Sequence, residues 1–379
     1  MTTTPVPTPP AMGISHRLRR WRNALLSSPK FQEAAVSNPF TRPKARAEAA
    51  KLFNLCTGFV HSQVLLACVQ LDLISKIAAR PMDIGEAASA MDLPLDGAER
   101  LLKAAASLQL LSQQSDGRYT LGDLGASLMG NPSVLAMIRH HGDLYKDLAD
   151  PVALLRREGP PTRLSQFWGY AAADSPSEAA RDSAAEYSAL MAETQAFIAR
   201  DVMAAHDLST YAHIMDLGGG TGAFLSAVAH AHPSPQLTLC DLPPVAELAE
   251  QMFRETSLNS RIRAIGVDFT KDPVPEGADL ITLVRILHDH DNGPVRGLLN
   301  KVRRALPAGG RLLIAEPMAG TPGAEAMGDA YFGLYLWAMG SGRARKRNEL
   351  TEMLHEAGFG QVREAKTRQP LLVRVLIAE

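Results

Sequence analysis

The chain has 379 residues, of which 46% are hydrophobic and 21% charged, and its formal net charge is −1. This length and apolar content predict two or three globular domains with a large core, and the balanced charge argues against a general nucleic-acid binder. Cys56, Cys68 and Cys240 are widely spaced and form no C-x-x-C pair, which predicts reduced thiols in a cytoplasmic protein.

The first 40 residues are predicted to form a flexible basic segment. Residues 1–12 are rich in proline and threonine and lack a secretory signal pattern. No 18 apolar residues run uninterrupted, so no membrane span is predicted. Residues 13–30 surround Trp21 with Arg17, Arg19, Arg20 and Arg22. This pattern indicates either an amphipathic helix that lies on anionic lipid or a solvated helix that packs through Trp21 and Leu25.

Residues 41–155 are predicted to form an all-helical winged-helix dimerisation domain, apart from a short hairpin around Ser115, Asp116 and Gly117. A winged-helix outline raises the question of DNA binding. The helix that would read DNA, residues 95–111, balances two acidic against two basic side chains. DNA binding is therefore disfavoured, and we interpret this region as a packing or dimerisation module.

Residues 156–210 are predicted to be connecting helices, including a long helix over 182–208. From residue 211 to 379 short apolar runs alternate with helical segments, which predicts a Rossmann-like α/β domain with a doubly wound parallel sheet of seven strands. The predicted strands include 213–217, 236–241, 261–269, 279–284 and 311–316. The C-terminal residues read as two strands joined by a turn, so an antiparallel edge is expected.

The first of these strands ends in HIMDLGGGTGAF, residues 213–224. Bare glycine backbone lets a ligand lie directly on the main chain. Gly218, Gly220 and Ala223 satisfy the G-x-G-x-x-G/A dinucleotide pattern. Asp241 ends the next strand, at about the sequence spacing expected of an acidic residue that binds the ribose. The glycines alone do not choose between NAD and another nucleotide-like cofactor.

Three features favour S-adenosylmethionine over NAD. Asp216 precedes the glycines, where a carboxylate suits an ammonium group and would repel a pyrophosphate. Asp268 and Phe269 follow the third strand, where they suit an adenine. The expected antiparallel edge is the third feature, since nicotinamide-binding sheets generally lack it.

Four segments in order, MDLGGGTGAFLSAVAHAHPSPQLTLCDLP, GVDFTKDPVPEGADLITLVRILHDHDN, ALPAGGRLLIAEPM and EMLHEAGF, resemble the S-adenosylmethionine-dependent O-methyltransferases of the plant caffeic-acid type. Within that family, FNLCTGFVHSQVLLACVQLDL and GDAYFGLYLWAMGSGRAR are most similar to the hydroxyneurosporene (demethylspheroidene) O-methyltransferases of carotenoid biosynthesis. The resemblance runs from about residue 45 to the C-terminus. It implies a class I methyltransferase domain behind a winged-helix dimerisation domain.

The resemblance implies roles for individual residues. The cofactor would be held by Asp216, Gly218, Gly220, Asp241, Leu242, Asp268, Phe269 and Arg285. His288 in ILHDHDN would be the general base, since an imidazole suits proton removal near neutral pH, and Glu316 would orient its ring. The plant-type enzymes carry a second glutamate in G-K-E-R-T, and here Ala344 takes that position.

The acceptor implied is apolar, most specifically the tertiary 1-hydroxyl of an acyclic carotenoid. Its pocket would be lined by Met327, Tyr331, Phe332, Tyr335 and Met339 on a single helix. His140 and His141 are interpreted as pocket-rim or structural residues, Asp289 as a local cap or turn residue, and no metal is expected.

Two alternatives stay open. One is a methyltransferase of the same architecture that acts on a bacteriochlorophyll precursor or a phenol, and the other is a non-catalytic winged-helix regulator that senses S-adenosylmethionine. The leading interpretation is a homodimeric cytoplasmic enzyme that contacts no nucleic acid. Residues 13–30 would bring it to the photosynthetic inner membrane.

Overall fold

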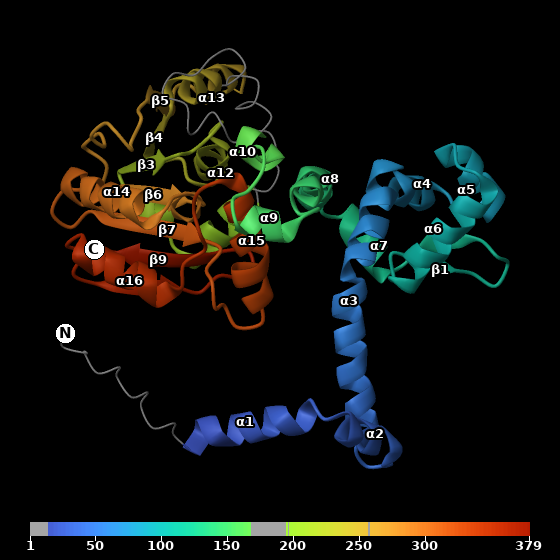
Figure 1. Ribbon diagram of the computed structural model, residues 1–379. Coiled ribbons are helices and arrows are strands. Elements are labelled where there is room, and N and C mark those ends of the chain that lie inside the picture. The colour runs from blue at the N-terminus through green and yellow to red at the C-terminus, as the bar shows by residue number, and fades with distance from the viewer. Residues whose placement is uncertain (1–13, 168–194, 196, 257) are drawn as a thin grey trace. The chain divides into compact units, whose positions relative to one another are not determined.

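The computed structural model describes residues 14–167, 195, 197–256 and 258–379. The predicted flexible stretch 1–12 and most of the predicted long helix 182–208 lie outside these residues. The chain divides into two compact units, Met1–Gly122 and Asp123–Glu379, which Figure 1 colours from blue through green to red along the chain. The second unit begins at Asp123, whereas the sequence pattern places the end of the N-terminal domain at residue 155.

The first unit is helical with one small sheet. Its helices are α1 (Ile14–Leu26), α2 (Pro29–Ser37), α3 (Arg42–Gln70), α4 (Leu73–Ala79), α5 (Ile84–Met91) and α6 (Leu95–Ser107). Strands β1 (Leu111–Gln113) and β2 (Tyr119–Leu121) pair antiparallel, which confirms the hairpin predicted around Gly117. Asp83 and Glu86 form a capping box that starts α5. Glu86 also accepts a hydrogen bond from Arg118 at 2.8 Å. This bond connects the β1–β2 hairpin to α5.

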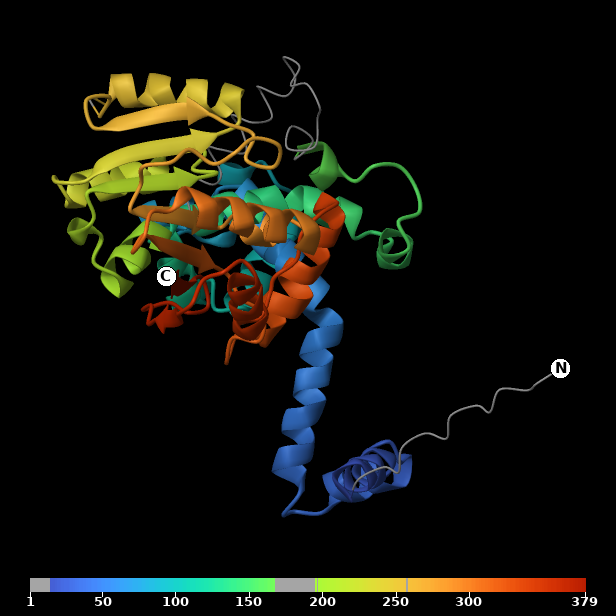
Figure 2. The same cartoon turned by 90° about the vertical axis from the view of Figure 1, so that its left-hand side faces the viewer.

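Helix α3 is one long, unbroken helix (Figure 2). Only its last turns are buried, and Phe53, Leu55 and Phe59 are exposed. By length and composition alone, α3 could cross a membrane. The sequence did not predict a span here, because polar residues interrupt the apolar ones. Large apolar side chains exposed over several turns indicate a surface that binds a partner.

The second unit contains the large sheet. Before the sheet come α7 (Asp123–Met129), α8 (Pro132–Asp147), α9 (Pro151–Leu155), α10 (Arg163–Phe167), a helix over 197–205 and η2 (Leu208–Thr210). The sheet region follows with β3 (His213–Leu217), α12 (Ala223–Ala231), β4 (Gln236–Asp241), α13 (Pro243–Glu255), β5 (Ile262–Gly266), β6 (Leu280–Val284), η3 (Leu287–Asp289), α14 (Asn292–Ala305) and β7 (Arg311–Glu316). The chain closes with η4 (Ala326–Tyr331), α15 (Phe332–Met339), α16 (Arg347–Glu356), β8 (Val362–Ala365) and β9 (Arg374–Ala378).

The seven-stranded sheet has the order β5-β4-β3-β6-β7-β9-β8. Neighbouring strands from β5 to β7 are parallel, and β9 runs antiparallel to both β7 and β8. The doubly wound parallel sheet and its antiparallel edge are therefore confirmed.

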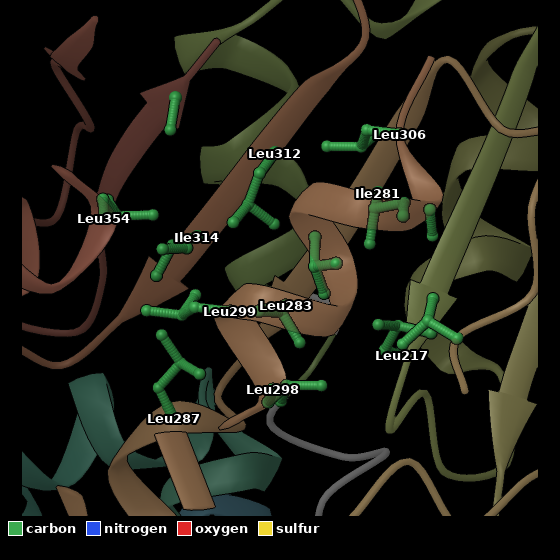
Figure 3. Packing of buried hydrophobic residues seen from close by; sticks show 14 of the residues in the cluster. Leu217, Ile281, Leu283, Leu287, Leu298, Leu299, Leu306, Leu312, Ile314 and Leu354 are labelled. Carbon is green, nitrogen blue, oxygen red and sulfur yellow. The ribbon is translucent and has the colours of Figure 1, made fainter. Parts of the chain in front are cut away.

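Both faces of the sheet are covered, because successive strand residues point to opposite sides. Ile281 and Leu283 of β6 pack with Leu299 of α14 in one cluster (Figure 3). Leu280 and Val284 pack in the other cluster with α12, α13 and the 197–205 helix. Strands covered on both faces read as continuous apolar runs, which is why the sequence locates them so closely.

This topology determines where a site lies. The order reverses at β3, because β4 lies on one side of it and β6 on the other. In doubly wound sheets ligands bind at the carboxyl ends of the strands around such a switch point. The carboxyl ends of β3, β4, β6 and β7 carry Leu217, Asp241, Val284 and Glu316.

Candidate active site

The glycine loop follows β3 directly. Gly218 has a φ of +73° and Gly220 of +58°, in the left-handed region that glycine adopts without strain. A side chain at Gly218 would clash with Cδ1 of Ile286. A Cβ at Gly220 would meet no atom within 4 Å, so the main chain there is open to a ligand.

Asp216 lies beneath this loop and is 1% exposed. Its Oδ1 accepts from the Thr282 hydroxyl at 2.6 Å, and its Oδ2 has no donor among the described residues. Burial raises the pKa of Asp216 to about 7, the charge of Asp241 adds to the rise, and the Thr282 hydrogen bond opposes it. A buried carboxylate oxygen without a donor suits a ligand cation.

Asp241 ends β4 beside the same loop. Its Oδ2 accepts from the Gly220 N–H at 2.8 Å and its Oδ1 from the Leu242 N–H at 2.7 Å. Each oxygen keeps a lone pair, because a carboxylate offers about four acceptor sites. The side chain is thus fixed at the loop and can still accept from ribose hydroxyls.

Asp268 and Phe269 lie after β5. Asp268 Oδ1 accepts from the N–H and hydroxyl of Thr270. Burial alone would raise the pKa of Asp268, but these bonds and the Lys271 charge outweigh it and lower that pKa. Phe269 is buried, and its Cε1 lies 3.6 Å from the position of a Cβ at Gly218.

These residues fit S-adenosylmethionine. An oxygen without a donor at Asp216, an open main chain at Gly220 and a fixed carboxylate at Asp241 match an ammonium group, a close ligand backbone and ribose hydroxyls in turn. Arg285 has a left-handed φ of +60°, and its N–H donates to the Ala315 carbonyl at 2.8 Å. The contact of its side chain with the cofactor stays a prediction.

His288 and Glu316 meet at the ends of β6 and β7. His288 Nδ1 lies 2.5 Å from Glu316 Oε2. Glu316 Oε1 accepts from the N–H groups of Ile286 and Leu287 at 2.8 and 2.6 Å. A carboxylate only accepts, so the neutral ring carries its proton on Nδ1 and leaves the lone pair on Nε2.

That second nitrogen faces Asp289, whose Oδ1 lies 3.1 Å from His288 Nε2. Asp289 lies in the 3₁₀ turn η3, in keeping with the predicted cap or turn residue, and its carboxylate and that of Glu316 also flank the His288 ring. Burial alone would lower the pKa of His288, but the charges of Asp289 and Glu316 outweigh it, so the pKa is raised.

Four of the predicted pocket residues lie close together, since Tyr331 stacks on Tyr335 with ring centroids 5.7 Å apart, and Tyr331 and Phe332 pack against the buried cluster that contains Tyr335 and Met339. Phe332 lies edge-on to His288 with ring centroids 5.7 Å apart, and Tyr331 packs on Phe332 at 5.1 Å. Tyr335 and Met339 belong to a buried cluster with residues of α8, α9 and α10. The single predicted helix is in fact a π-helical segment, 326–331, that continues into α15. Met327 lies within the π-helical part.

His140 and His141 contact two tyrosines of the predicted pocket. Their Nε2 atoms lie 2.7 Å from the Tyr335 hydroxyl and 2.8 Å from the Tyr331 hydroxyl, respectively. Burial lowers the pKa of both, that of His141 to about 4. They are therefore neutral at pH 7, and each tyrosine hydroxyl has a neutral partner.

The sequence did not reveal three contacts of the candidate site: the Thr282 hydroxyl with Asp216, the Asp289 carboxylate with His288, and Arg345 with the Leu287 carbonyl. Arg345 is buried beneath the 287–292 loop. Its position in an arginine-rich run gave no signal, because arginine runs are usually solvated.

Known proteins resemble this chain over nearly its whole length. The chain matches the family model of the O-methyltransferase domain over residues 145–360 and that of the O-methyltransferase dimerisation domain over 53–131. It is 41% identical to a demethylspheroidene O-methyltransferase of Cereibacter sphaeroides over 98% of this chain and 97% of that protein. A demethylspheroidene O-methyltransferase of Rhodobacter capsulatus is 40% identical over 93% and 87%.

A solved structure with the same fold is that of human N-acetylserotonin methyltransferase in complex with S-adenosylmethionine. It superposes with a TM-score of 0.71 at 26% identity and covers 88% of this chain and 97% of that chain.

The raised pKa of Asp216 predicts pH-dependent cofactor affinity. Below about pH 7 the folded protein holds a proton on Asp216, and an ammonium group favours the ionised form. Binding of S-adenosylmethionine should therefore release a proton, and affinity should weaken by up to about tenfold per pH unit as pH falls below the pKa. Calorimetric titration in buffers of different ionisation enthalpy measures both quantities.

In Asp216→Asn we expect weaker binding that no longer changes with pH near 7, so that only the dependence from Asp241, whose pKa burial raises to about 6, remains. Asp116→Asn, in the β1–β2 hairpin, serves as the control and should keep the wild-type profile. A wild-type affinity that is constant from pH 6 to 8, without proton release, would contradict the role of Asp216.

Proposed function

Because the chain belongs to the O-methyltransferase family and uses S-adenosylmethionine, we propose that its acceptor is the tertiary 1-hydroxyl of an acyclic carotenoid. The observation that carries this proposal is the 41% identity to a demethylspheroidene O-methyltransferase over nearly the whole of both chains. The aromatic side chains of Phe332 and Tyr331 beside His288 support an apolar acceptor.

S-adenosylmethionine, when bound, supplies the methyl group on its sulfonium. The chain's own part begins with His288, whose Nε2 receives the proton of the acceptor hydroxyl. Glu316 keeps the ring in the tautomer that leaves Nε2 free to accept. An acceptor hydroxyl at Nε2 shares or displaces the Asp289 contact at 3.1 Å.

An aliphatic tertiary alcohol is a very weak acid, so full deprotonation before the transfer is excluded as a separate step. The proton leaves as the new C–O bond forms. In such a reaction the alignment of the two reactants can lower the activation free energy by as much as ~7–11 kcal/mol. A rigid histidine and a shaped apolar pocket are therefore both needed.

The alternative acceptors are a bacteriochlorophyll precursor and a phenol. Members of the family act on varied acceptors, as the naphthoate and N-acetylserotonin in the names of two relatives indicate. The regulator hypothesis is not supported, because these relatives are named as methyltransferases.

An acceptor comparison tests the proposal. Purified protein is incubated with labelled S-adenosylmethionine and, separately, with a 1-hydroxylated acyclic carotenoid, a bacteriochlorophyllide or a catechol, and products are identified by mass. We expect label in the carotenoid. Label in another acceptor alone would overturn the carotenoid assignment and leave the methyltransferase intact.

The same assay tests His288. In His288→Gln we expect kcat to fall by about 100-fold or more, with unchanged cofactor affinity. In the wild type the neutral base forms only above its raised pKa, so kcat/KM should fall as pH drops through a value above 6.5. Wild-type turnover in His288→Gln would exclude it as the base.

The dimerisation-domain match supports a homodimer. That match begins at Phe53, within the exposed apolar part of α3. A subunit interface therefore accounts for an apolar surface that would otherwise suit a membrane span.

For residues 13–30 we propose contact with an anionic membrane surface, from which a cytoplasmic enzyme would collect a lipid-soluble acceptor. In α1, Leu18, Trp21 and Leu25 follow a spacing of three and four residues and share one face. Trp21 is 66% exposed. Arg17 and Arg22 flank this face, and α1 contains no acidic residue. Such a helix suits the headgroup region of an anionic bilayer.

Cosedimentation with vesicles tests this contact. We expect binding to phosphatidylglycerol vesicles that weakens with salt, and little binding to phosphatidylcholine. Replacing Arg17 and Arg22 by glutamine should weaken binding by about tenfold or more, since each basic residue contributes about 1 kcal/mol. Arg254→Gln, on α13, is the control. Equal binding to both lipids, or an unchanged double variant, would contradict the proposal.

A further inference from the structure

The loop that carries His288 is bound from a second side by Arg345. Its guanidinium donates from Nη1 to the Leu287 carbonyl and from Nη2 to the His290 carbonyl, both at 2.6 Å. Its Nε donates to Asn292 Oδ1 at 3.1 Å. One planar side chain thus contacts the loop on both sides of His288.

This arginine is in an unusual environment. It is 2% exposed, and within the described ranges no carboxylate lies within salt-bridge distance of it. Burial chiefly lowers its pKa to about 10, so it remains charged at neutral pH. A buried cation that contacts only neutral acceptors is costly for stability, which indicates a role beyond folding.

Ser341 and Gly342, which precede Arg345, contact the same loop. Ser341 Oγ donates to the Asp289 carbonyl at 2.9 Å, and the Gly342 N–H donates to Asp291 Oδ1 at 3.1 Å. A Cβ at Gly342 would clash with the His288 carbonyl oxygen. The Arg345 carbonyl in turn accepts from the Ala319 N–H at 3.0 Å, which fixes this segment close to the end of β7.

We propose that Arg345 is a positioning residue that holds the 287–292 loop so that the His288 ring keeps its distance and angle to the acceptor hydroxyl. Glu316 binds the N–H groups at the start of the loop, and Arg345 binds the carbonyls on either side of His288. The loop is thereby held through both kinds of main-chain group. The proposal rests on the role of His288 as base.

The test compares Arg345→Lys with Arg343→Lys. Lysine keeps the charge but cannot span two carbonyls in a fixed plane. Arg343 lies two residues earlier and pairs with Glu349 at 2.8 Å, near the surface. In Arg345→Lys we expect kcat to fall by about 10- to 100-fold, S-adenosylmethionine affinity to stay unchanged, and deuterium exchange over 286–292 to accelerate. Arg343→Lys should behave as the wild type in all three.

A double-mutant cycle separates positioning from a general structural role. If Arg345 acts through His288, Arg345→Lys causes no further loss of kcat in a His288→Gln background. A full additional loss there, or wild-type kcat in Arg345→Lys, would overturn the proposal. If His288→Gln alone keeps wild-type turnover, the base assignment fails, while the exchange measurement still reports on the loop contacts.

Gly342→Ala provides a second variant should Arg345→Lys fail to fold. It leaves the guanidinium in place and displaces the loop through the His288 carbonyl. The same loss of kcat, absent in the His288→Gln background, is expected. Wild-type kcat in Gly342→Ala would contradict the view that loop position controls the reaction.

Discussion

The carboxylate of Glu316 is the interaction on which the acceptor half of the site depends. It accepts from two successive N–H groups and from the His288 ring. The parallel register of β6 and β7, with Val284 opposite Ala315, brings these groups together, because both strands end at the same edge of the sheet. Without three donors, a carboxylate that is 2% exposed would carry a large desolvation cost. The hydrogen bonds that stabilise the buried Glu316 carboxylate are therefore the same ones that fix the loop after β6 and the His288 ring.

The cofactor half uses charge differently. Asp216 is buried and accepts from Thr282, Asp241 is partly buried and accepts from two N–H groups, and desolvation raises both pKa values, that of Asp241 to about 6. Their carboxylates are poised to gain partners from a ligand that carries an ammonium group and hydroxyls. At Glu316 the donors come from the chain itself. In the proposed site the cofactor would therefore supply the missing partner of Asp216, whereas hydrogen bonds within the chain already hold Glu316 and His288.

The sequence predicted most of the fold, because strands buried on both faces appear as apolar runs and the glycine loop marks the first of them. It also singled out Asp216, Asp241, His288 and Glu316 as site candidates, since each lies at or just after the carboxyl end of a strand. It could not locate Thr282 or Arg345, whose roles arise from hydrogen bonds to residues 66 and 58 positions away. The π-helical start of the pocket helix was missed as well, because π-helical hydrogen bonding has no simple sequence period.

If Glu316 orients a catalytic histidine, the Glu316→Gln variant should lose that orientation. A glutamine oxygen can accept from the two N–H groups only if its amide group faces His288 Nδ1, and the reverse orientation leaves those N–H groups opposed by a donor. We expect kcat to fall by about 100-fold or more while the affinity for S-adenosylmethionine is retained, with the exposed Glu325→Gln as control. A Glu316→Gln enzyme that folds and keeps kcat within about twofold of the wild type, a smaller change than the contribution of a general base, would show that Glu316 does not orient a catalytic base.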